Sequence, residues 1–202
     1  MIPNSWSLLD RNELKSFQHN SIDKLTWKDP SIESFEVQFN DIKKSIRGGV
    51  LKKTVPVVSS TARTDDQESL IRSLIIKGAQ NEGPSFLYAF QNGSCGFVGL
   101  SPELLFEIDD KTIRTMALAG TSSESNLENF NLDQKEEIEH QIVVDSLRRR
   151  LGKYGTISES ERRTHNLGGI VHFLTDIKIK LKQQLSISEV LKQIHPTLAV
   201  GT

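Results

Sequence analysis

Residues 85–120 read SFLYAFQNGSCGFVGLSPELLFEIDDKTIRTMALAG, and they carry the strongest β-strand signal in the chain. Its apolar runs are separated by short polar turns, first at Asn92-Gly93 and then at Asp109-Asp110-Lys111. Asn-Gly between two apolar runs favours a two-residue hairpin turn, because both central residues of that turn need a positive φ. The stretch therefore predicts two consecutive β-hairpins in an antiparallel sheet.

Helical patterns flank the hairpins. Apolar residues recur at helical spacing in residues 31–47, 65–78 and 133–151, and Gly48-Gly49 and Gly78 follow the first two patterns as stop signals. The third pattern predicts a buried side made of Ile138, Ile142, Val143, Leu147 and Leu151. A fourth, shorter helix is expected after Ser186, which is a suitable N-cap. The predicted fold class is α/β of the α+β kind, with largely antiparallel sheets.

Two further segments favour strands. The sequence VLKKTVPVVSS at residues 50–60 is rich in β-branched residues, and GGIVHFLTDIKIKL at residues 168–181 alternates apolar and polar residues. The polar residues 121–130 predict a surface loop. Cys95, inside a predicted strand, is interpreted as a small buried hydrophobe.

The composition excludes several classes of protein. Lys and Arg number 25 against 26 Asp and Glu, for a net charge of -1, which argues against nucleic acid or an anionic membrane as partner. One cysteine excludes an internal disulfide and a multi-cysteine zinc site. No apolar run reaches the roughly 18 residues of a membrane span, and the first residues show no export signal. We therefore expect a cytoplasmic protein.

Six short segments appear in one order along the chain. They are GGVLKKTVPVV (48–58), GFVGLSPELLFEI (96–108), MALAGTSS (116–123), DQKEEIEHQIVVDSL (133–147), VHFLTDI (171–177) and IHPTLAVG (194–201). In sequence and spacing they resemble the chorismate-binding enzymes, namely anthranilate, aminodeoxychorismate, isochorismate and salicylate synthases. The resemblance covers roughly residues 35–202 and implies the layered fold of anthranilate synthase component I, in which two α/β halves pack their sheets face to face.

The resemblance implies an acid and a base. In the isochorismate and salicylate branches, water adds at one carbon of chorismate while a hydroxyl leaves from another, so a base must activate water and an acid must protonate the leaving oxygen. Lys53 matches the base and Glu103 matches the acid, whose pKa burial would raise. The alternatives stay open: one of Lys52 and Lys53 faces solvent, and Glu after Ser-Pro is commonly a surface turn residue.

Further matches imply a metal and a substrate surface. Glu139 matches a carboxylate that binds Mg²⁺, whereas Glu136 and Glu137 are interpreted as a solvated cluster in the first turn of the helix. His140 would orient the metal-bound carboxylate.

The substrate-contacting positions of the family fall at Gly120, Thr121, His172 and Ala199. The glycine lets the backbone come close to the substrate, and the threonine offers a hydroxyl. A lone histidine among apolar residues is also common as a core residue, so His172 keeps both interpretations.

Two positions separate the branches of the family. The ammonia-using enzymes usually have glutamine where Lys53 stands, and aminodeoxychorismate synthases usually have a lysine where Ala119 stands. The resemblance therefore implies an isochorismate synthase-type enzyme that uses chorismate and Mg²⁺. The alternatives are a salicylate synthase, an anthranilate synthase component I-like enzyme and a non-catalytic chorismate-binding remnant.

Full-length members of the family continue for roughly another hundred residues past the HPTLAVG segment, by resemblance. We therefore expect residues 1–30 to be an N-terminal segment and residues 31–202 to be the first part of a catalytic domain. By resemblance, the part expected to be missing supplies a second Mg²⁺ carboxylate and an arginine for a substrate carboxylate, so we expect that part or another chain to be required. We expect these 202 residues to be inactive alone.

Overall fold

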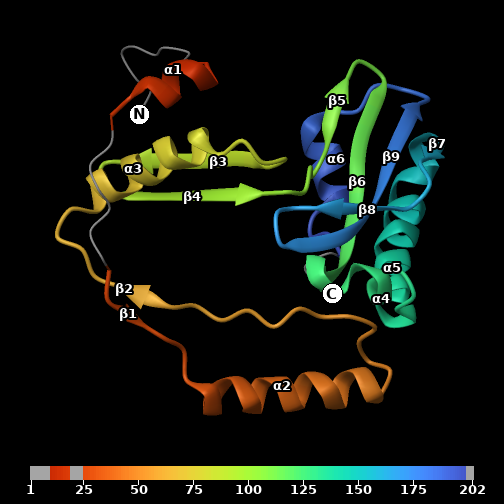
Figure 1. Cartoon of the computed structure of the whole chain (residues 1–202). Coiled ribbons are helices and arrows are strands. Elements are labelled where there is room, and N and C mark those ends of the chain that lie inside the picture. Colours follow the sequence, from red (N-terminus) through yellow and green to blue (C-terminus); the bar gives the residue numbers. More distant parts are fainter. Residues whose placement is uncertain (1–9, 19–24, 199–202) are drawn as a thin grey trace. The chain divides into compact units, whose positions relative to one another are not determined.

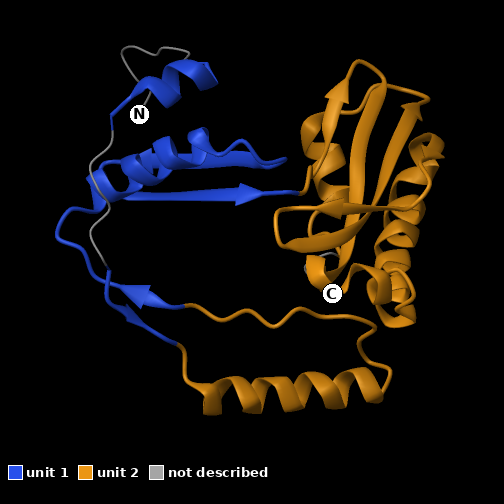
Figure 2. Ribbon diagram, in the orientation of Figure 1, with its two compact units in different colours: residues 1–29, 60–102 blue, residues 30–59, 103–202 orange. Residues whose placement is uncertain are grey.

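The structure is a computed structural model that describes residues 10–18 and 25–198. The chain forms two compact units, one of residues 1–29 and 60–102 and the other of residues 30–59 and 103–202 (Figure 2). The assignment of residues 31–202 to a catalytic domain stays a prediction.

The first unit contains a helix packed on a β-hairpin. Its elements are α1 (Arg11–Ser16), β1 (Trp27–Lys28), β2 (Thr61–Ala62), α3 (Gln67–Gln80), β3 (Phe86–Asn92) and β4 (Cys95–Ser101) (Figure 1). The predicted stop at Gly78 is wrong, because α3 continues to Gln80. A β-carbon on Gly78 would lie 2.6 Å from Cδ1 of Leu87, so this glycine allows the helix to lie close to the hairpin.

The β3–β4 hairpin is confirmed, but its turn lies one residue later than predicted. Asn92 pairs with Cys95, so Gly93 and Ser94 form the two-residue loop. Gly93 has φ +57°, which suits the first central position of a type II′ turn. Cys95 is exposed, so the prediction that it is a buried hydrophobe is wrong. A two-stranded sheet covered by one helix leaves its other face open.

The second unit contains a sheet, three helices of eight or more residues and short helical turns. Its elements are α2 (Ile32–Arg47), β5 (Glu107–Asp109), β6 (Thr112–Ser123), η1 (Glu124–Asn126), α4 (Leu127–Phe130), α5 (Gln134–Leu151), η2 (Gly152–Tyr154), β7 (Gly155–Glu159), β8 (Arg163–Asn166), β9 (Ile170–Leu181) and α6 (Ile187–Ile194) (Figure 1). The predicted hairpin β5–β6 and the four predicted helices of the chain are confirmed.

The sheet of the second unit is antiparallel throughout. Its order is β5-β6-β9-β7, and β8 also pairs with β9. The long strands β6 and β9 run side by side, and the register of their pairing shifts between Ala119 and Thr121. This shift is a β-bulge at Gly120, which has φ +76°. The predicted loop 121–130 is wrong in part, because β6 extends to Ser123 and two short helical turns follow.

One hydrophobic core lies between this sheet and the helices α5 and α6. Its buried members are Ile113, Ala117, Ala119, Val143, Val144, Leu147, Leu151, Ile177, Ile179, Leu181, Leu185, Val190 and Ile194. Ile138 is 60% exposed, so its predicted place on the buried side of α5 is wrong. The buried side instead runs through Glu136, His140, Val143 and Leu147, which share one face at helical spacing.

The predicted strand at residues 50–60 is wrong. This segment has no strand assignment apart from a single bridge residue, Thr54. A strand needs a neighbour to pair its backbone groups, and no described strand pairs along this segment. None of the helices in the described ranges is long and apolar enough to cross a membrane.

Candidate functional site

Lys53 and Glu139 form an ion pair that joins two distant segments. After α2, the amides of Val50 and Leu51 donate to the Ser45 carbonyl, and Gly49 at φ +70° turns the chain. Lys53 Nζ then lies 3.0 Å from Glu139 Oε1 on α5, with 10% of the lysine side chain exposed. Lys52 is exposed, so Lys53 is the member of the pair that points inward.

Glu139 stands between two cations. Its Oε2 lies 3.5 Å from Lys135 Nζ, in addition to the contact with Lys53. Burial alone would raise the pKa of Glu139, but the hydrogen bonds and charges of Lys53 and Lys135 outweigh burial and hold the pKa below its usual range. Glu139 is therefore a carboxylate at neutral pH.

Glu103 lies in the segment between β4 and β5. The segment is fixed to the sheet by Thr115, whose Oγ1 donates to the Leu105 carbonyl at 2.7 Å. Burial raises the pKa of Glu103 to about 7, although the positive charge of Lys53 opposes the shift. The carboxyl therefore exchanges its proton near neutral pH, as a general acid requires, and it lies within electrostatic range of Lys53.

Gly120, Thr121 and His172 meet at the β-bulge. Thr121 and His172 are paired across β6 and β9. His172 Nδ1 lies 3.1 Å from Thr121 Oγ1 and 2.9 Å from the Gly120 carbonyl oxygen. A β-carbon on Gly120 would lie 3.0 Å from the Glu136 carbonyl oxygen. The structure therefore brings three predicted residues together at a position that favours glycine.

Glu136 is bound to the same bulge, and its interpretation as a solvated residue is wrong. It is buried, and its Oε2 accepts a hydrogen bond from the Thr121 amide at 2.7 Å. Its other oxygen pairs with Lys135, which also contacts Glu139. Glu136 precedes the buried His140 by four residues, so a helical face traced backward from the core would have found it. Glu137 is more than half exposed and pairs with Arg162, as a solvated residue does.

His140 faces the core rather than the ion pair. Its Nε2 lies 2.9 Å from Thr175 Oγ1, and its ring meets Phe173 edge-on. Burial lowers its pKa, and Arg162 adds to the effect. The expected contact between His140 and Glu139 is not found, because successive residues on a helix point in directions about 100° apart.

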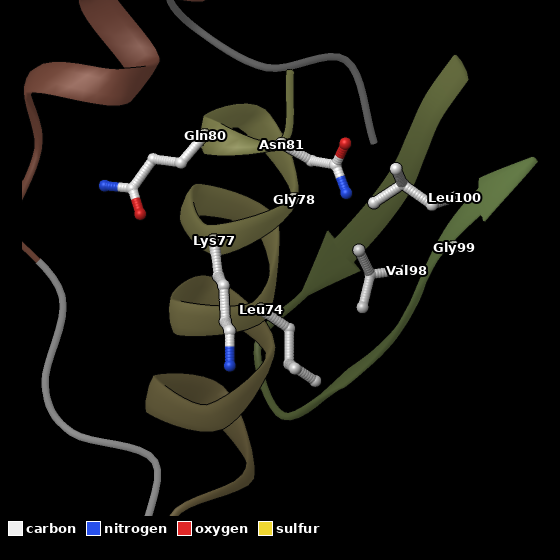
Figure 3. Close-up of a pocket in the computed structure, with 8 residues that line it drawn as sticks. All are labelled: Leu74, Lys77, Gly78, Gln80, Asn81, Val98, Gly99 and Leu100. Carbon is white, nitrogen blue, oxygen red and sulfur yellow. The ribbon is translucent and has the colours of Figure 1, made fainter. Parts of the chain in front are cut away.

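A cavity of about 550 Å³ lies in the second unit beside Lys53. Its lining residues are Val50, Leu51, Lys52, Lys53, Ile142, Asp145, Ser146, Arg149, Arg150 and Leu198. A cavity of about 520 Å³ lies between α3 and β4 in the first unit, where Leu74, Val98 and Leu100 line it (Figure 3). Of these two cavities, the first is lined by the predicted site residue Lys53 and therefore adjoins the candidate site.

The described residues do not make a complete magnesium site. Glu139 is the predicted ligand among them, and both its oxygens contact lysines. Within residues 10–18 and 25–198, no group of three or more His, Cys, Asp or Glu could hold a metal ion. The predicted substrate contact Ala199 lies outside the described residues.

Two enzymes resemble this chain in sequence. The salicylate biosynthesis isochorismate synthase of Pseudomonas aeruginosa is 30% identical over 83% of this chain and 37% of its own length. The isochorismate synthase MenF of Haemophilus influenzae is 31% identical over 80% of this chain and 40% of its own length. The chain thus spans about 40% of the length of these curated relatives.

Solved structures confirm the predicted fold over the part that the chain covers. MenF of Escherichia coli has a TM-score of 0.75 and 22% identity, over 90% of this chain and 44% of that protein. Anthranilate synthase component I of Streptococcus pneumoniae has a TM-score of 0.71 and 22% identity, over 96% of this chain and 44% of that protein. A family model described as chorismate binding enzyme matches residues 3–202. The chain therefore belongs to the chorismate-binding enzyme family.

Proposed function

We propose that the full-length polypeptide carrying this sequence is an isochorismate synthase-type enzyme. It adds water to chorismate with loss of the 4-hydroxyl, which gives isochorismate. The observation that carries the proposal is the placement of a half-buried glutamate with a pKa of about 7 within electrostatic range of an inward-pointing lysine. The names of the related isochorismate synthases support the same reaction.

The two residues divide the proton transfers. For this role Lys53 must first give up the proton that it holds in the ion pair with Glu139; it then takes a proton from the water whose oxygen forms a bond to one ring carbon. Glu103 gives its proton to the 4-oxygen of chorismate. The bond between this oxygen and the ring then breaks, and a ring double bond shifts. One water enters and one leaves, so the reaction is an isomerisation. A pKa raised to about 7 lets Glu103 hold the required proton near neutral pH and release it to the substrate.

Two features favour water over ammonia as the nucleophile. By resemblance, Lys53 stands where the ammonia-using enzymes have glutamine. Ala119 stands where aminodeoxychorismate synthases have a lysine that bonds to the substrate. Ala119 is buried beside the bulge, and its methyl group offers no nucleophile.

Products formed from chorismate distinguish this proposal from its alternatives. The full-length polypeptide is incubated with chorismate and Mg²⁺, in one arm with an ammonium salt, and products are separated by chromatography. Isochorismate supports the proposal, and salicylate indicates a second, pyruvate-eliminating step. Anthranilate would place the protein in the ammonia branch, and absence of any product would indicate a chorismate-binding remnant.

Magnesium binding is a second proposal that rests on the first. We infer that Glu139 contributes one ligand, and that the 202 residues alone bind Mg²⁺ and chorismate weakly. Mg²⁺ supplies a positive charge that stabilises substrate oxygens. Titration calorimetry of the 202-residue chain with Mg²⁺ should show no saturable heat at millimolar metal. Tight binding, or isochorismate made by this chain alone, would overturn the inference.

A further inference from the structure

The bulge between β6 and β9 has its backbone groups occupied by protein partners. The Thr121 amide donates to Glu136 Oε2 at 2.7 Å. The Gly120 carbonyl lies 2.9 Å from His172 Nδ1. A ligand that approaches the bulge therefore meets side chains, because the Thr121 N–H and the Gly120 carbonyl already have partners.

The Gly120 contact determines the tautomer of a neutral His172. A carbonyl oxygen only accepts hydrogen bonds, so Nδ1 must carry the proton and Nε2 must carry the lone pair. The protonated Nδ1 also lies 3.1 Å from Thr121 Oγ1. The threonine oxygen faces this N–H as an acceptor, so its own hydroxyl hydrogen points away from His172. Among the described residues, none hydrogen-bonds His172 Nε2.

Glu136 holds this arrangement from the helix side. Its side chain is 11% exposed and accepts the Thr121 amide next to a glycine at φ +76°. A charge-assisted hydrogen bond to a buried carboxylate is stronger than a neutral one, and it acts where the register of β6 and β9 shifts. Without this acceptor, the Thr121 amide would lose its partner, and the side-chain pair Thr121–His172 would lose its fixed backbone.

We infer that Glu136 is a positioning residue that fixes the Gly120–Thr121 bulge, so that the bulge presents the Thr121 hydroxyl as a donor and His172 Nε2 as an acceptor to a hydroxyl group of the ligand. One donor beside one acceptor matches a hydroxyl, which both accepts and donates. The role toward a ligand rests on the proposed function, whereas the positioning role is a property of the folded chain and can be tested without turnover.

The test is amide hydrogen exchange and ring-nitrogen NMR of the 202-residue chain and three variants. Glu136→Ala removes the acceptor, Glu136→Gln keeps an acceptor oxygen, and Glu137→Ala is the control at an exposed neighbour. The Leu181 amide, which donates to the Lys111 carbonyl, reports whether the sheet is intact.

Glu136→Ala is expected to speed exchange of the Thr121 amide about tenfold to a hundredfold and to shift the His172 ring nitrogens. Glu136→Gln is expected to restore most of the protection, and Glu137→Ala to change neither signal. Unchanged Thr121 exchange in Glu136→Ala, with Leu181 still protected, would overturn the inference. If Glu136→Ala does not fold, the same measurements on the unsubstituted chain test the inference. A His172 ring protonated on Nε2 instead of Nδ1 would overturn it, and so would a Thr121 amide that exchanges without protection. The proposed function is tested separately, by the products that the full-length polypeptide forms from chorismate.

Discussion

Lys53 Nζ lies 3.0 Å from Glu139 Oε1, although the two residues come from a segment without regular structure and from the middle of a long helix. With one side chain 10% exposed and the other 28% exposed, this ion pair is largely removed from water. It places the predicted base beside the predicted metal ligand and fixes residues 50–53 against α5. A partly buried pair of this kind is expected to couple more strongly than a surface pair.

The coupling between Lys53 and Glu139 is measurable by a double-mutant cycle. Lys53→Met and Glu139→Gln, singly and together, should give a coupling free energy of about 1–3 kcal/mol in urea unfolding. The control is Lys44 with Asp41, which lie 3.7 Å apart but are 81% and 71% exposed and should couple by less than about 0.5 kcal/mol. Equal coupling in the two cycles would show that burial does not strengthen the Lys53 pair.

Glu103 should make stability fall as pH rises. Its pKa is about 7 in the folded chain against an ordinary value of 4.5, so between these values the folded state holds a proton that the unfolded state has released. The free energy of unfolding of the parent should therefore decrease relative to Glu103→Gln from about pH 4.5 to about 7 and stay level above, by on the order of 1–3 kcal/mol. Urea unfolding of both proteins across this range measures the difference.

Substitution of Lys53 tests whether its charge influences the titration of Glu103. Because its charge lowers the pKa of Glu103, Lys53→Met should move the Glu103 titration, followed by carboxyl carbon NMR, to higher pH. Lys52→Met, at the exposed neighbour, should leave it in place. An unchanged or lower pKa of Glu103 in Lys53→Met would mean that the lysine charge does not lower it.

Gly120 should tolerate alanine less well than another glycine with similar backbone geometry. Gly120 and Gly168 have φ +76° and +81°, but an added β-carbon meets atoms at 3.0 and 3.1 Å at Gly120 and nothing within 4 Å at Gly168. Both substitutions incur backbone strain of about 1 kcal/mol, and Gly120→Ala should lose a further 1–3 kcal/mol or so through overpacking. Thermal unfolding compares them, and equal losses would remove the packing argument.

Cys95 should react with a thiol reagent in the folded protein. It is exposed at the start of β4, so one thiol is expected to react without denaturant at a rate near that of the urea-unfolded chain. The Cys95→Ser variant gives the background. A thiol that reacts only after unfolding would contradict the exposed position.

Secondary-structure predictions were correct for elements whose signals lie within a few residues. They were wrong where the structure depends on a partner that is distant in the sequence. The hairpin β5–β6 and the helix α5 follow from turn residues, caps and apolar periodicity, all within a few residues. The strand at residues 50–60 did not form despite its β-branched residues, since pairing needs a neighbouring strand. Cys95 was misassigned because alternation does not tell which face of a two-stranded sheet is covered.

The same limit applies to the candidate site. The sequence indicated that one of two adjacent lysines points inward, and the structure identifies Lys53. It did not predict the partner of Lys53, because that contact depends on how the segment meets α5. Glu136 was missed because three nearby acidic residues look like a solvated first turn, although its spacing from His140 and Val143 places it on the buried face.

We propose that Lys53 activates water for addition to chorismate. The most direct test is kcat/KM for isochorismate formation by the full-length polypeptide, its Lys53→Gln variant and its Lys52→Gln variant, with folding checked by circular dichroism. Loss of a positioned general base should lower kcat/KM by about a hundredfold or more in Lys53→Gln, while Lys52→Gln stays within about threefold of the parent. A folded Lys53→Gln variant that forms isochorismate at the parental rate would show that Lys53 is not the base.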